Sequence, residues 1–131
     1  MGSILVADDL VQSPIVVVST DGEIMLFQDV ASAEGYLEPV DVKGGEYKAA
    51  YDANGRAFDI AVGIQRRRFL GIFPVVLERV ELVRKSEPPK HAELTAALRR
   101  FLPTLGIAEE TVATATLAEL LGTAREVAFQ K

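Results

Sequence analysis

The sequence predicts an α+β fold: an antiparallel sheet of about five to six strands, one short helix after the first hairpin, and C-terminal helices packed on one face of the sheet. The first observation is that residues 15–84 are rich in β-branched and aromatic side chains and are interrupted by Asp-Gly, Gly-Gly and Asn-Gly turns. The second is that apolar residues recur at helical spacing after residue 85. The third is size, because 131 residues with 49% hydrophobic side chains suit one α+β domain spanning residues 1–131.

The first elements are a hairpin and a short helix. Residues 15–20 and 24–27 have strand composition and flank a short turn at Asp21-Gly22, so we expect them to pair antiparallel. Asp29 stands where its side-chain oxygen would accept a hydrogen bond from the first free amides of a helix. That helix should cover residues 30–38 and end at Pro39, which cannot continue it.

Four extended segments are expected next. Residues 40–42 and 46–51 are predicted to be extended runs joined by Gly44-Gly45, and Asn54-Gly55 supplies the following reversal. Residues 56–64 alternate between apolar and small or polar side chains, as in a half-buried strand. Residues 74–84 also fit a helical period, but their valine-rich composition favours a strand, with a bulge left open.

The remainder of the chain is predicted to form two or three helices. Ser86 and the prolines that follow it should end the extended region and open a helix. The apolar stripe of that helix consists of Leu94, Ala97, Leu98, Phe101 and Leu102. Thr116 and Glu119 have the spacing of a capping box ahead of the last helix. We expect these C-terminal helices to pack on one face of the sheet.

Composition excludes several chemistries. The chain has no cysteine, which excludes disulfides, thiolate metal sites and cysteine nucleophiles, and its one histidine excludes a multi-histidine metal site. We therefore expect no cofactor and no metal. Asp8, Asp9 and Gln12 interrupt the apolar stretch over residues 4–18, so we expect neither a signal peptide nor a membrane partner. We expect the protein to be cytoplasmic.

The candidate catalytic residues have structural explanations. His91 should lie in the first turn of a helix with no nucleophile at a motif spacing. Adjacent carboxylates such as Glu109-Glu110 point apart and do not converge on a metal or a glycoside. The basic run at residues 66–68 is read as a solvated strand end, because a net charge of −5 disfavours a nucleic-acid partner. We therefore expect a protein that is not an enzyme.

Charge is distributed unevenly along the chain. Residues 1–64 carry 11 acidic and 3 basic side chains, a net charge of −8, whereas residues 65–131 carry 8 acidic and 11 basic side chains, a net charge of +3. Such asymmetry can steer a basic partner toward one face, although acidic loops kept for solubility explain it equally well.

Three segments resemble small bacterial immunity proteins, which are encoded beside toxins of polymorphic or contact-dependent inhibition systems. They are residues 31–47 (ASAEGYLEPVDVKGGEY), 51–56 (YDANGR) and 87–94 (EPPKHAEL). The resemblance implies a cytoplasmic inhibitor that binds one cognate toxin domain, often a nuclease, and blocks its active site by occupancy. Acidic side chains placed where phosphates would bind suit that role. The candidate toxin-binding residues are Glu34, Glu38, Asp41, Glu46 and Asp59.

Two other functions stay open at this point. A small-molecule-binding domain or small enzyme would use the concave face of the sheet, lined by Tyr36, Tyr47 and Tyr51. This reading assumes that Tyr47 and Tyr51 share a strand face, and core packing explains these tyrosines equally well. An oligomerisation module would instead expose a large apolar helix face.

Overall fold

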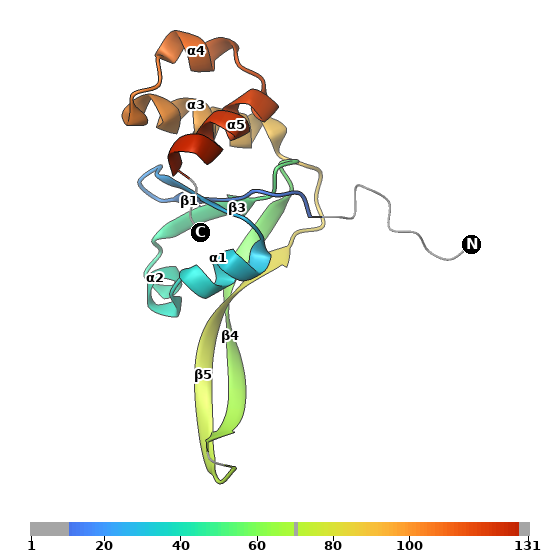
Figure 1. Ribbon diagram of the computed structural model, residues 1–131. Coiled ribbons are helices and arrows are strands. Elements are labelled where there is room, and N and C mark those ends of the chain that lie inside the picture. Colours follow the sequence, from blue (N-terminus) through green and yellow to red (C-terminus); the bar gives the residue numbers. More distant parts are fainter. Residues whose placement is uncertain (1–10, 70, 129–131) are drawn as a thin grey trace, which may run out of the picture.

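The computed structural model describes residues 11–69 and 71–128, which form one sheet covered by helices (Figure 1). Its strands are antiparallel neighbours in the order β2-β1-β3-β4-β5, which confirms the α+β class. In chain order the elements are β1 (Ile15–Ser19), β2 (Ile24–Phe27), α1 (Val30–Tyr36), α2 (Pro39–Lys43), β3 (Tyr47–Tyr51), β4 (Ala57–Phe69), β5 (Phe73–Arg84), α3 (His91–Phe101), the 3₁₀ helix η2 (Leu102–Leu105), α4 (Glu109–Thr114) and α5 (Leu117–Ala128). Asp8, Asp9 and the side chains of Arg67 and Arg68 lie outside this description.

The local signals at the first hairpin and at the helix starts are confirmed. β1 and β2 pair around a turn in which Gly22 has a φ of 89°, a conformation that glycine adopts without strain. Asp29 accepts a hydrogen bond from the Ser32 amide at 2.7 Å and so caps α1. Thr116 and Glu119 form the expected capping box, with reciprocal bonds of 2.8 and 3.2 Å.

Residues 40–42 are helical, so the expected extended run there was wrong. They belong to α2, which begins at Pro39. Proline suits the first position of a helix because the missing N–H has no intrahelical acceptor there. Asp41 in the first turn and Lys43 in the last turn also match the direction of the helix dipole. α1 ends at Tyr36, two residues earlier than predicted, and Pro39 starts a second helix.

The C-terminal helices cover one face of the sheet, as expected, and the two short helices cover the other face. α3, η2, α4 and α5 cover one face, where Val16 and Val18 pack with Leu94, Leu98 and Leu120. α1 and α2 cover the other face, where the core consists of Ile15, Val17, Phe27, Ala33, Leu37, Ala50, Phe58, Val80 and Leu82. β1 is buried on both sides, which explains its unbroken apolar sequence.

A register shift in the sheet separates two tyrosines that were expected to share a strand face. Val18 lies opposite Ala49, but Ser19 lies opposite Tyr47, so β3 has one extra residue at this point. An extra residue reverses the alternation of side chains. Tyr47 therefore packs with the α1–α2 side of the sheet, and Tyr51 packs under the C-terminal helices.

β4 and β5 continue past the rest of the sheet as a two-stranded ribbon (Figure 1). They pair without interruption from Phe58 and Arg84 to Phe69 and Phe73, so β5 has no bulge and β4 is longer than predicted. β3 pairs with β4 only at Ala50 and Tyr51. We call residues 61–69 and 71–81 the arm. Among the described residues, no helix is long and apolar enough to cross a membrane.

Candidate functional site

Three of the predicted toxin-binding residues surround one tyrosine on the α1–α2 side of the sheet. Burial raises the pKa of Tyr47, and the carboxylates of Asp41, Glu38 and Glu46 raise it further. The chain turns back after α2, where the Glu46 amide donates to the Asp41 carbonyl at 3.0 Å. We call Glu38, Asp41, Glu46 and Tyr47 the acidic surface.

An aromatic side chain borders the acidic surface. Tyr36, the last residue of α1, is 52% exposed and packs its ring 5.3 Å from that of Phe27. Tyr36 also makes a small contribution to the raised pKa of Tyr47. Aromatic side chains with one fixed face and one exposed face are common in protein interfaces. The acidic surface therefore combines charge with a rigid apolar contact.

Glu34 makes a structural contact that the sequence did not predict. Its carboxylate Oε2 accepts a hydrogen bond from the Leu82 amide at 2.8 Å, and its Oε1 lies 4.0 Å from Nη2 of Arg79. Only 21% of the Glu34 side chain is exposed. Glu34 therefore ties α1 to β5, and the sequence position alone gave no sign of this contact.

Asp59 lies apart from the other candidates. It follows Ala57 at an interval of two along β4, so it points to the face that carries the C-terminal helices. There it is exposed and forms an ion pair of 3.5 Å with Lys85. The structure therefore brings Glu38, Asp41 and Glu46 together and leaves Asp59 on the opposite face.

The pocket nearest to the expected tyrosine-lined surface lies between β3, β4 and the start of α3. It has a volume of about 330 Å³, and its border carries three lysines and three carboxylates, which are Lys48, Lys85, Lys90, Asp59, Glu87 and Glu93. Tyr51 donates a hydrogen bond to Glu93 at its edge, and burial and this contact raise the pKa of Tyr51. Tyr47 and Tyr51 line the pocket and Tyr36 does not, so two of the three expected tyrosines lie here.

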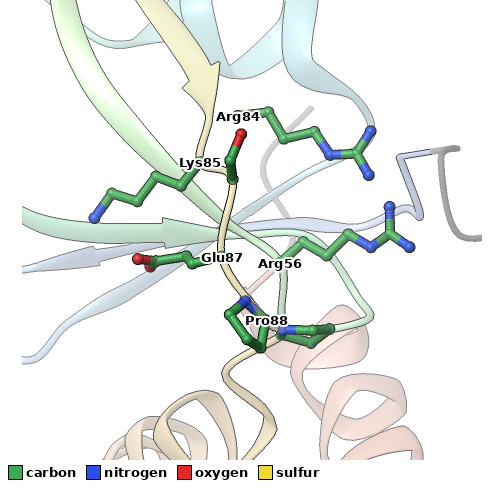
Figure 2. Close-up of a pocket in the computed structure, with 7 residues that line it drawn as sticks. Arg56, Arg84, Lys85, Glu87 and Pro88 are labelled. Atoms are coloured by element: carbon green, nitrogen blue, oxygen red, sulfur yellow. The ribbon is translucent and has the colours of Figure 1, made fainter.

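A second pocket, of about 580 Å³, was not anticipated from the sequence (Figure 2). Arg56 and Arg84 extend their guanidinium groups to the same side of it, while Lys85 and Glu87 extend to the other. The two arginines become neighbours because Phe58 lies opposite Arg84 in the β4–β5 ladder. Only knowledge of that register would have revealed the pair.

A buried carboxylate supports the loop that leads into this region. Asp52 is fully buried and accepts hydrogen bonds from the amides of Asn54 at 2.9 Å, Arg56 at 3.0 Å and Gln12 at 3.2 Å. The Gly55 carbonyl then accepts from the Lys90 amide at 2.7 Å, which fixes the start of α3. The next residue, His91, is exposed in the first turn of α3, where it was predicted.

No group of three or more His, Asp or Glu side chains that would hold a metal ion occurs within residues 11–69 and 71–128. Comparison of the chain with family models, with curated proteins and with solved structures found no match.

Proposed function

We propose that this chain is a non-catalytic immunity protein that binds a bacterial toxin domain and neutralises it by occluding its active site. The observation that carries the proposal is the acidic surface, where three carboxylates gather around Tyr47. Nuclease toxins bind phosphate through lysine and arginine, and carboxylates on a rigid support occupy the same positions. The resemblance of residues 31–47 to immunity proteins covers this same surface.

The proposed contact residues are Glu38, Asp41 and Glu46. Glu38 and Glu46 are exposed and Asp41 is half-buried, so all three present charge at the surface. Glu34 contributes to the fold through Leu82, and Asp59 faces the opposite direction, so neither belongs to the proposed contact. We place the protein in the cytoplasm, where an inhibitor of this kind protects the cell that makes it.

A first experiment identifies the partner. The tagged chain is used to capture a protein from its native host, and the captured protein is identified by mass spectrometry. Expression of the captured protein alone in a test bacterium should arrest growth, and co-expression with this chain should restore it. A captured protein that is harmless on its own would refute the proposal. Recovery of a bound metabolite without any protein would favour the small-molecule reading.

A second experiment tests the surface with matched charge reversals. Glu38→Lys changes the acidic surface, whereas Glu126→Lys makes the same change on exposed α5, on the other side of the sheet. Association with the captured toxin is measured at low and at high salt. Glu38→Lys should slow association by roughly 10-fold at low salt and weaken its salt dependence, because encounter rates follow the local potential. Equal association rates for the two variants would exclude this surface.

The pocket between β3, β4 and α3 is the site that a small-molecule function would use. Its volume of about 330 Å³ lies at the lower end of the range for ligand pockets. Lys85 and Lys90 form ion pairs with Asp59 and Glu87 of the same lining, so Lys48 is the lysine that would contact an anionic group of a ligand there. A thermal-shift screen with small carboxylates and phosphates distinguishes this function from the first, because stabilisation that disappears in Lys48→Ala would assign the pocket.

A further inference from the structure

We propose that the arm is a self-association element, in which β5 pairs antiparallel with β5 of a second copy of this chain about a two-fold axis at Val76. The starting observation is that the arm exposes large apolar side chains. They are Ile64 (64% exposed), Ile72 (71%), Phe73 (58%), Val76 (61%) and Leu77 (43%).

A two-stranded ribbon is marginally stable in water, and stability usually needs three or more strands or a covering helix. Residues 61–69 and 71–81 form such a ribbon, because β3 leaves β4 after Phe58. Pairing of two arms would give a four-stranded sheet, in which exposed apolar side chains of both copies become neighbours. A second copy therefore supplies the additional strands that would stabilise the arm.

The free edge of β5 can be located from its hydrogen bonds. The Lys85 amide donates to Ala57 of β4, so odd-numbered residues of β5 turn their amides toward β4 and even-numbered residues turn theirs outward. Two of the outward positions are covered: Leu82 donates to Glu34, and Val80 is only 1% exposed. Pro74 has no amide hydrogen, which suits a strand edge. The free edge thus runs from Pro74 to Glu78.

The midpoint of this free edge is Val76, and a two-fold axis there gives a compatible register. Val76 would face Val76 of the second copy, and Leu77 would face Val75, which is an apolar cross-strand pair. Arg79 would face Phe73, so no two like charges lie directly opposite each other. Phe73 is the first residue of β5, so the pairing would stop before the covered Val80.

The position of the apolar residues favours a protein strand over a lipid surface. Ile64 lies opposite Glu78, six residues along β5 from Ile72 at the turn, which is about 20 Å of strand. An interfacial segment penetrates only about 5–10 Å into a lipid headgroup layer, so Ile64 would stay uncovered. The basic run at residues 66–68 lies on the same arm as Glu78 and Glu81, so duplex DNA is the competing partner that the test below includes.

The register is tested with a single cysteine, because the chain has none of its own. Val76→Cys would place two sulfur-bearing residues at a Cα separation of about 5.5 Å, which permits a disulfide. Ile64→Cys is the matched control, since Ile64 is equally exposed on the same face of the arm but would lie about 20 Å from its copy. After mild oxidation, Val76→Cys should run as a covalent dimer on a non-reducing gel, and Ile64→Cys should not.

The mass in solution is tested by light scattering across a range of concentrations. The unmodified chain should rise from 14.2 kDa toward twice that mass, and Val76→Lys should stay at 14.2 kDa because two lysines would meet at the axis. Ile64→Lys should associate as the unmodified chain does. Circular dichroism checks that each variant is folded. An unmodified chain that stays monomeric, equal cross-linking of both cysteine variants, or binding of anionic vesicles or duplex DNA by a monomer would overturn the proposal.

Discussion

Replacing Glu34 by Ala should destabilise the protein by about 2 kcal/mol, because the carboxylate accepts a hydrogen bond from a covered amide. The Oε2 atom lies 2.8 Å from the Leu82 amide nitrogen, and Leu82 is only 8% exposed, so water cannot replace the carboxylate easily. Hydrogen bonds to charged groups contribute about 1.5–3 kcal/mol. Arg79 adds little, since its nearest nitrogen is 4.0 Å away and its side chain is half exposed.

The free energy of unfolding is measured by urea unfolding at neutral pH, monitored by circular dichroism. Its slope against urea concentration should be the same in all variants, which shows that only stability has changed. Glu34→Gln keeps an acceptor oxygen and should lose less than Glu34→Ala. Glu38→Ala is the control, because Glu38 is exposed and its side chain caps no amide of α2, so its effect should stay within about 0.5 kcal/mol. A Glu34→Ala variant as stable as Glu38→Ala would refute the structural role of this carboxylate.

Two more predictions concern buried polar groups. The pKa of Tyr51 is raised above its ordinary value of 10.0, so its share of stability is complete below pH 10 and is lost as the pH rises through the raised value. Above pH 10 the free energy of unfolding of the unmodified chain should therefore fall more steeply with pH than that of Tyr51→Phe. An equal pH dependence in the two proteins would contradict this. Asp52→Ala should cost about 3 kcal/mol or more in urea unfolding, because three amides lose the buried carboxylate. A loss under 1 kcal/mol would contradict the assigned role of Asp52.

The parts of the fold that the sequence predicted correctly depend on contacts between near neighbours. Asp29 caps a helix three residues away, and Thr116 and Glu119 bond each other across the same interval. Gly22 and Gly55 adopt positive φ within their own turns. Such chemistry is complete within four or five residues, so it can be read before the tertiary structure is known.

The features that the sequence did not predict depend on contacts between residues far apart in the chain. The side on which Tyr47 lies depends on one extra residue in β3, which no pattern in that strand reveals. Glu34 meets Leu82 across 48 residues of sequence, and Arg56 meets Arg84 only through the register of β4 and β5. The charge count located the acidic half of the chain correctly but could not say which carboxylates converge. Tertiary contacts decide which carboxylates lie close together, so only the folded structure shows that Asp59 lies apart from the acidic surface.

An ion pair connects the free edge of β5 to the helix that carries Asp41 of the acidic surface, between Lys43 at the end of α2 and Glu78 on the arm. Both side chains are about half exposed, and an exposed pair of this kind contributes only about 0–1 kcal/mol. The coupling between the two surfaces should therefore be weak, so toxin binding and self-association can be separated by mutation. Glu38→Lys should slow toxin association and leave the dimer intact, and Val76→Lys should do the reverse. If Val76→Lys also slowed toxin association, the arm would belong to the toxin-binding surface, and the second copy would compete with the toxin for the same strand edge.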